Sequence, residues 1–161
     1  IMFYIGHLQD SSLKRIVLAK NQRFLLASPE YIQSMPNLTT PHDLENHLCI
    51  GLRENDEDAT MWQFTEKQTG EITRVRVTPK LSSNVSQITK DWCLGGQGII
   101  QRSEWDVKKE LAAGTLIRLL PNYQLPSADI VALLSSESYN RSRKVTALLE
   151  FVQQRLTERL C

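Results

Sequence analysis

The sequence predicts an α/β fold. Strand-like apolar runs alternate with helix-like segments along the whole chain, and no internal repeat or low-complexity segment interrupts this alternation. The 161 residues are 41% hydrophobic and 23% charged, which is typical of a globular domain. A chain of this length buries a substantial core without disulfides or a structural metal.

Three strands are expected near the start of the chain. Residues 1–5, IMFYI, are apolar or aromatic throughout, as in a strand that is buried on both faces. The polar stretch 10–12 then favours a turn. Two further strand-like runs follow at 14–20 and 23–28, and polar residues separate them.

Two short helices are expected next, because SPEYIQSM and TTPHDLENHL carry the same helix-start signal. Each has a hydroxyl residue as N-cap, then proline at the first helical position, then an acidic residue near the positive end of the helix dipole. These residues are Ser28, Pro29 and Glu30 in the first segment, and Thr40, Pro41 and Asp43 in the second.

A β-hairpin is predicted over residues 61–77, with Gly70 in the turn. On its second strand Thr73, Val75 and Val77 share one face. The acidic stretch 53–60 before the hairpin is expected to be a solvated loop.

The segment 82–96 has the clearest helix signal. Ser83 or Asn84 can cap it, and Gly95 or Gly96 can supply the left-handed residue that ends it. Its apolar residues fall on one helical face. They are Val85, Ile88, Trp92 and Cys93.

The C-terminal third continues the alternation. An extended run is expected at 98–100, a helix at 103–113, and strands at 115–120 and 129–135. A long amphipathic helix follows from Ser142 to the C-terminus. Its apolar stripe consists of Val145, Leu148, Leu149, Val152, Leu156 and Leu160.

Two polar breaks, near 20–22 and 135–142, divide the chain into a middle block and two flanking pieces. If the flanking pieces pack together, the protein has two lobes joined by two crossings of the chain.

Charge and cysteine usage exclude several classes of function. Lys and Arg number 19 against 18 Asp and Glu, and this even balance gives no electrostatic case for binding of nucleic acid or a membrane by this segment. No apolar run is long enough to span a bilayer. Cys49, Cys93 and Cys161 form no C-x-x-C motif, which favours reduced thiols in a cytoplasmic protein.

No motif in the sequence indicates catalysis, a metal or a cofactor. His42 and His47 are five residues apart, unlike a helical metal pair, and we expect them to be exposed or capping residues. The glycine cluster GGQG lacks the Lys-Ser/Thr of a phosphate-binding loop and follows a helix instead of a strand. The acidic run 54–58 lacks the glycine of a calcium loop.

Two polar groups are candidates for binding a ligand. Ser82, Ser83 and Asn84 stand at the start of a predicted helix, where they either act as simple N-caps or form a site for a carboxylate with the free N–H groups. Ser11 and Ser12 follow the first strand, where they form a plain turn or line a cleft.

The order of these features resembles the effector-binding domain of LysR-type transcriptional regulators. YIGHLQDSSLKRIVLAKNQRFLLASPEYI is similar to its strand, G-x-L-x-D-S-S-L and L-A-x-x-x-R-x-L-x-A-S-P-x-Y-L pattern. TTPHDLENHLCI resembles its T-P-x-D-L-x-x-H-x-C-[IL], and WQF its W-x-F. LSSNVSQITKDWCLGGQGIIQRSEWDVKKELAAGTLIRLL resembles its S-N-…-G-x-G-I-…-W-x-V pattern, and RSRKVTALLEFV is loosely similar to its C-terminal motif. The similarity covers essentially the whole chain.

The resemblance implies a two-lobed α/β fold like the type 2 periplasmic binding proteins, with the first lobe incomplete in this chain. The first lobe would contain residues 1–21 and 137–161, and the second lobe residues 22–136.

The resemblance also implies a ligand site in the cleft between the lobes. Tyr4 stands where many members of the family have arginine, which removes one cation from this cleft. The expected ligand-binding residues are Tyr4, Gly6, His7, Ser11 and Ser12 from the first lobe and Ser82, Ser83, Asn84 and Ile99 from the second.

By the same resemblance, the chain is expected to be a non-enzymatic, cytoplasmic sensory domain. It would bind a small organic inducer, with acidic and aromatic compounds as the first candidates. DNA binding would belong to an N-terminal helix-turn-helix domain outside this chain, and the complete regulator would be a homodimer or homotetramer. The alternative is a periplasmic solute-binding protein of a transporter.

Overall fold

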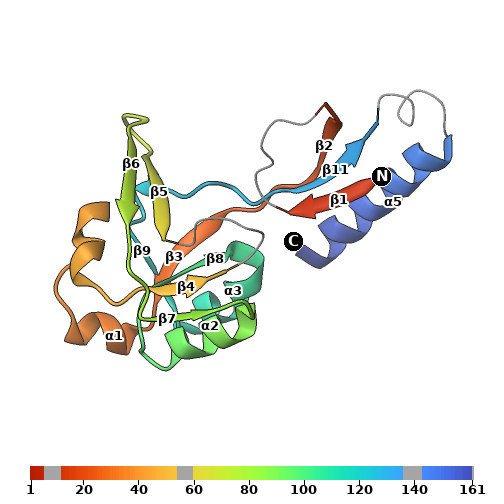
Figure 1. Cartoon of the computed structure of the whole chain (residues 1–161). Coiled ribbons are helices and arrows are strands. Elements are labelled where there is room, and N and C mark those ends of the chain that lie inside the picture. Colours follow the sequence, from red (N-terminus) through yellow and green to blue (C-terminus); the bar gives the residue numbers. More distant parts are fainter. Residues whose placement is uncertain (6–11, 54–59, 136–142, 161) are drawn as a thin grey trace. The chain divides into compact units, whose positions relative to one another are not determined.

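The computed structural model describes residues 1–5, 12–53, 60–135 and 143–160. The chain folds into two compact units (Figure 1). Unit 1 contains Ile1–Gln22 and Ser127–Cys161, and unit 2 is the uninterrupted segment Arg23–Pro126. The predicted acidic loop lies almost entirely outside the described residues.

Unit 1 is a three-stranded antiparallel sheet with one helix packed on it. The sheet order is β1 (Met2–Ile5), β11 (Ile130–Leu134) and β2 (Lys14–Ala19), so the last strand in sequence lies between the first two. Helix α5 (Arg143–Leu160) packs on one face of this sheet (Figure 1). Its Leu149 lies in one hydrophobic cluster with Leu18 of β2 and with Ala132 and Leu134 of β11.

The prediction that strand β1 is buried on both faces is wrong. Phe3 is 47% exposed and Ile5 50% exposed. The reason is that β1 is an edge strand with β11 as its neighbour, while the core of this unit forms between α5, β2 and β11. The predicted stripe of α5 is confirmed at Leu149 and at its partly buried neighbours, whereas Leu148 is exposed.

The structure divides the chain at a different place from the sequence prediction. The first crossing follows Gln22, next to the predicted position. The return crossing lies between Pro126 and Ser127 instead of between residues 136 and 137. Strand β11 pairs with both strands of unit 1, so the segment that contains it belongs to that unit.

Unit 2 contains eight strands and four short helices within its described residues. Its strands are β3 (Arg23–Ala27), β4 (Ile50–Leu52), β5 (Met61–Glu66), β6 (Ile72–Arg76), β7 (Leu81–Ser83), β8 (Ile100–Ser103), β9 (Ile117–Leu119) and β10 (Tyr123–Gln124). Its helices are α1 (Pro29–Ser34), the 3₁₀ helix η1 (Pro41–Asn46), α2 (Ser86–Leu94) and α3 (Glu104–Ala113). The sheets have the orders β8-β3-β9, β10-β5-β6 and β4-β7.

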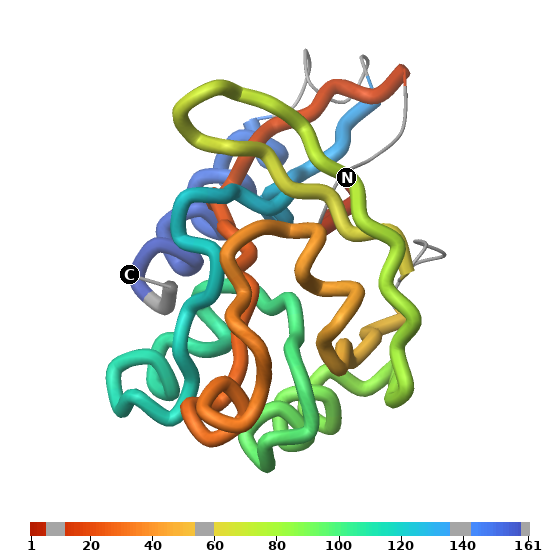
Figure 2. Tube along the Cα trace, turned by 90° about the vertical axis from the view of Figure 1, so that its left-hand side faces the viewer, coloured from red at the N-terminus to blue at the C-terminus, as the bar shows by residue number. Residues whose placement is uncertain are grey.

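The local signals that predicted elements of unit 2 are largely confirmed. The Ser28 side chain accepts a hydrogen bond from the Tyr31 N–H at 3.3 Å and caps α1. Asp43 accepts from the Thr40 N–H at 2.8 Å at the start of η1, and this bond is the main reason that its pKa falls to about 2. The hairpin of β5 and β6 turns at Gly70, which has a φ of +74° (Figure 2).

Strand β3 separates two hydrophobic clusters, because successive side chains of a strand point to opposite faces. Leu25 and Ala27 belong to the cluster that includes Tyr31 and the hairpin residues. Phe24 and Leu26 belong to the cluster that includes residues from α2 and α3. The central sheet of unit 2 is therefore buried on both faces.

The apolar stripe predicted for α2 is only partly correct. Cys93 is fully buried, but Val85 and Ile88 are 47% and 40% exposed. The buried face of the helix instead includes Thr89 and Lys90. Lys90 forms ion pairs there with Asp106 and Glu110 of α3, as a buried lysine requires.

Gly98 allows two segments of unit 2 to approach closely. Its φ is +151°, and a Cβ at this position would lie 2.5 Å from the Leu48 carbonyl oxygen. Directly beside it, the Ile99 N–H donates to the Leu48 oxygen at 2.8 Å, and the Ile50 N–H donates to the Ile99 oxygen at 2.9 Å. These bonds join β4 to the sheet that contains β8.

Gly98→Ala is expected to lower the free energy of unfolding by about 3 kcal/mol or more, because strain at positive φ adds to a backbone clash. Urea unfolding monitored by circular dichroism measures this loss. Gly114→Ala is the matched control, since Gly114 has a φ of +72° and nothing within 4 Å of an added Cβ. The control should lose about 1 kcal/mol. Equal losses in the two variants would contradict this account.

A second prediction concerns His47, which is buried and shares a hydrogen bond of 3.2 Å with the Tyr31 hydroxyl. Burial lowers its pKa from the ordinary 6.5, although the Asp43 carboxylate opposes this shift. The unfolded chain therefore binds this proton at a higher pH than the folded chain. The free energy of unfolding should fall as the pH is lowered from about 7 to about 5.

Urea unfolding at several pH values tests the His47 prediction. His47→Asn keeps a polar group near the Nδ1 position but removes the titration, so its stability should change less over the same pH range. His42→Asn is the control, because His42 is exposed. A pH dependence that survives in His47→Asn and disappears in His42→Asn would overturn the assignment.

Candidate functional site

The candidate site in unit 2 lies where the parallel strands β4 and β7 end. Their register pairs Ile50 with Leu81 and Leu52 with Ser83. Beyond this pair, the Arg53 N–H donates to the Ser83 carbonyl oxygen at 2.9 Å. In open α/β sheets, ligands bind outside the carboxyl ends of the strands.

The structure corrects the predicted start of the helix that follows β7. Helix α2 has Val85 as its N-cap residue, with no side-chain capping bond, so neither Ser83 nor Asn84 caps it. The Ser83 hydroxyl instead accepts a hydrogen bond from the Val85 N–H at 3.0 Å. Ser83 lies in the strand, where it holds the turn into the helix.

The polar side chains before α2 are accessible to solvent. Ser82 and Asn84 are exposed, and Ser83 is half-buried. The first-turn N–H groups of α2 have no acceptor within the helix and carry its positive dipole end. Exposed Val85 and Ile88 lie beside them on the helix. This edge thus combines hydrogen-bond donors with an apolar surface.

Arg53 adds a positive charge to the same edge. Its side chain is exposed, and among the described residues it makes no ion pair. Sequence reasoning missed Arg53 because β4 has three residues, too few to show a periodic pattern. The available signal was the apolar run from Cys49 to Leu52, followed directly by a cation.

Ile99 lies in the core of unit 2. Its side chain is fully buried and packs in the cluster that includes Leu25 and Cys49. Its N–H and carbonyl groups are both used in the bonds to the strand β4 region. A ligand would reach the Ile99 side chain only if this core opened.

The expected site residues of the first lobe lie in unit 1 or outside the described residues. Tyr4 is partly buried in β1, where it pairs with Val131 of β11. Ser12 is exposed shortly before β2. The remaining three, Gly6, His7 and Ser11, are outside the described residues.

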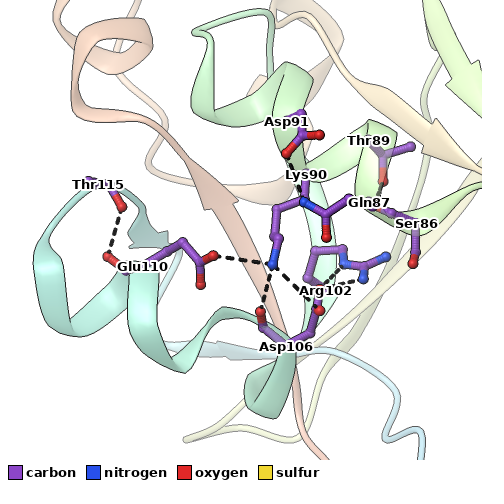
Figure 3. Close-up of polar contacts among 9 residues, drawn as sticks. All are labelled: Ser86, Gln87, Thr89, Lys90, Asp91, Arg102, Asp106, Glu110 and Thr115. Atoms are coloured by element: carbon purple, nitrogen blue, oxygen red, sulfur yellow. Dashed lines mark hydrogen bonds and ion pairs between the residues drawn. The ribbon is translucent and has the colours of Figure 1, made fainter.

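A polar network fixes α2 against α3. Lys90 on α2 points toward α3, where its Nζ lies 3.2 Å from the Glu110 carboxylate and 3.1 Å from the Asp106 carbonyl oxygen (Figure 3). The Asp106 carboxylate also binds Arg102 of β8, with 2.9 Å between Nε and Oδ2. Buried Lys90 therefore anchors α2 to α3, and buried Arg102 anchors α3 to β8.

The thiols and histidines of the described residues do not form a catalytic group. Burial raises the pKa of Cys49 and of Cys93 to about 12, so both remain protonated thiols at neutral pH. His42 is exposed as expected, but His47 is buried beside Tyr31, which corrects the expectation for that residue. No group of three metal-ligating side chains occurs in the part of the chain that the structure describes.

Within the described helices, none combines the length and the apolar character that crossing a bilayer requires.

Comparison with known proteins assigns the chain to a family. Residues 1–157 match the family described as the LysR substrate binding domain. The transcriptional activator TtdR of Escherichia coli K12 is 39% identical over 158 residues, which cover 96% of this chain and 47% of TtdR. The transcriptional regulator DmlR of the same strain is 38% identical over 141 residues, 88% of this chain and 45% of DmlR. The chain thus spans about half the length of these relatives.

Solved structures agree with this assignment. The regulatory domain of AphB from Vibrio vulnificus has a TM-score of 0.75 at 25% identity, covering 95% of this chain and 73% of that chain. The regulatory domain of CrgA from Neisseria meningitidis has a TM-score of 0.70 at 24% identity, covering 96% of this chain and 74% of that chain. The predicted type 2 periplasmic-binding-protein-like fold is confirmed. The chain belongs to the LysR substrate-binding domain family of transcriptional regulators.

Proposed function

We propose that this chain is the inducer-binding sensory domain of a bacterial LysR-type regulator that acts in the cytoplasm without catalysing a reaction. The match of residues 1–157 to the substrate-binding domain family carries this proposal. The alternative, a periplasmic solute-binding protein, is not favoured, because the relatives are named as transcriptional regulators. Units 1 and 2 would be the two lobes of this domain.

We propose further that the inducer is a small organic acid, held in unit 2 at the end of β4 and β7. The Arg53 guanidinium is suited to a carboxylate, because it can donate two parallel hydrogen bonds. Ser82, Ser83 and Asn84 would add polar contacts beside the first-turn N–H groups of α2. Exposed Val85 would contact the apolar part of the ligand.

We also propose which residues of unit 1 contact the inducer and how inducer binding changes DNA binding. Tyr4, Gly6, His7, Ser11 and Ser12 would complete the site from unit 1. Inducer binding would shift the geometry of a homodimer or homotetramer and so change DNA binding by an N-terminal helix-turn-helix domain.

Arg53→Gln is expected to weaken binding of the inducer by about 10- to 100-fold, because it removes a charge-assisted hydrogen bond. A thermal-shift screen of small organic acids first identifies a ligand, since binding raises the melting temperature by mass action. Isothermal titration calorimetry then measures the affinity of each variant. Arg74→Gln is the control, because Arg74 is an exposed cation on β6. Equal affinity in Arg53→Gln and the wild type would refute the carboxylate site.

Ser83→Ala and Asn84→Ala are each expected to weaken the same ligand by about 3- to 10-fold, the effect of losing a neutral hydrogen bond. Ser83→Ala also removes the acceptor of the Val85 N–H and loosens the turn. Calorimetry with Asn46→Ala as an exposed polar control separates these effects from a general loss of stability. If neither variant changes the affinity, the ligand does not bind at the start of α2.

A further inference from the structure

The two connections between the units begin at one place in unit 1. The chain leaves unit 1 after Gln22 and returns at Ser127. Asn21 precedes Gln22 at the first connection, and Ala128 and Asp129 follow Ser127 at the second. These residues are far apart in the sequence, yet they are bonded to each other in the structure.

Asn21 binds the returning strand through its backbone and its side chain. The Asn21 carbonyl oxygen accepts from the Ala128 N–H at 3.0 Å, and the Asn21 side-chain amide donates to the Ala128 carbonyl oxygen at 3.0 Å. The Asn21 N–H donates to the Asp129 carboxylate, also at 3.0 Å. Asn21 is 3% exposed, so its side-chain bond to Ala128 is shielded from competing water, while its N–H bond to Asp129 is partly buried.

Asp129 connects this group to the neighbouring strand. Its second carboxylate oxygen lies 3.5 Å from the Arg15 guanidinium on β2. The Asp129 carboxylate thus binds both Asn21, next to the first connection, and Arg15 on strand β2, which leads to that connection. We call Asn21, Ala128 and Asp129 the crossing clamp.

The crossing clamp limits where the connections can bend. The two connections are held together at Asn21 and Ala128. Backbone rotation is therefore left to the φ and ψ angles of Gln22 and Arg23 on one connection and of Pro126 and Ser127 on the other. The ring of Pro126 restricts φ at one of these positions. Two tethers that start from one fixed point allow fewer orientations than two independent tethers.

We propose that the crossing clamp is a hinge stop, which restricts how far the two units can reorient relative to each other. Its action requires no ligand. The proposal therefore goes beyond the proposed function and can be tested whether or not an organic acid binds.

Spin labels measure the expected reorientation directly. Cysteines introduced for exposed Lys109 on α3 and exposed Gln153 on α5 report the distance between the units. Cys161 is replaced by serine, while buried Cys49 and Cys93 do not react with the label in the folded chain. A second label pair, at Lys67 and Lys109, reports a distance within unit 2 and serves as the folding control.

Asn21→Ala is expected to widen the distribution of the distance between the units about twofold, because it removes a buried link of the clamp. Asp129→Ala should do the same, because it removes the acceptor of the Asn21 N–H. The distance within unit 2 should stay unchanged in both. Gln22→Ala is the matched control, since Gln22 is the exposed neighbour of Asn21.

Amide hydrogen exchange gives a second test, which begins with the wild-type chain. The Ala128 and Asn21 N–H groups should exchange as slowly as those of β11, and the Asn21 N–H should exchange about fivefold to tenfold faster in Asp129→Ala. Fast exchange of both groups in the wild type would overturn the proposal. So would an unchanged distance distribution in every clamp variant whose distance within unit 2 is preserved.

Discussion

The backbone ladder between Leu48, Ile99 and Ile50 holds unit 2 together. It joins the two-stranded sheet β4-β7 to the three-stranded sheet β8-β3-β9. Adjacent residues of the ladder point to opposite faces, so Cys49 and Ile99 enter one hydrophobic cluster while Ile50 enters the other. Gly98 permits this contact because a side chain there would occupy the space of the Leu48 carbonyl group. The position of β4, and with it Arg53, follows from this approach.

Much of the fold could be predicted because its signals are local. Ser28 and Pro29 mark the start of α1 through bonds made within one turn, and Gly70 marks the hairpin through its own backbone angles. Strands of two or three residues, such as β4, β7 and β10, contain too little pattern to be recognised. The exposure of Phe3 also could not be predicted, because it depends on which strand becomes an edge.

The candidate site was partly predictable for the same reason. Ser83 and Asn84 can be selected as candidates because they are small polar residues just before a helix. This pattern is local and does not depend on contacts with distant residues. Arg53 joins them through parallel pairing of β4 with β7, which single-sequence patterns do not encode. Likewise, Lys90 is buried because α3 supplies Glu110, so the buried face of α2 differs from its apolar stripe. Both the position of Arg53 and the buried face of α2 therefore depend on contacts between residues that are distant in the sequence.

The placement of β11 in the middle of the unit 1 sheet has a consequence for synthesis on the ribosome. Strands β1 and β2 emerge early, but each hydrogen bonds to β11 and not to the other. All of unit 2 must be made before β11 appears, and the helix that covers the sheet comes later still. Unit 2 can therefore fold first during vectorial synthesis, whereas the strand Met2–Ile5 can pair with β11 only after unit 2 has been made. By folding, unit 2 brings its two ends together and shortens the search that the late strand must make.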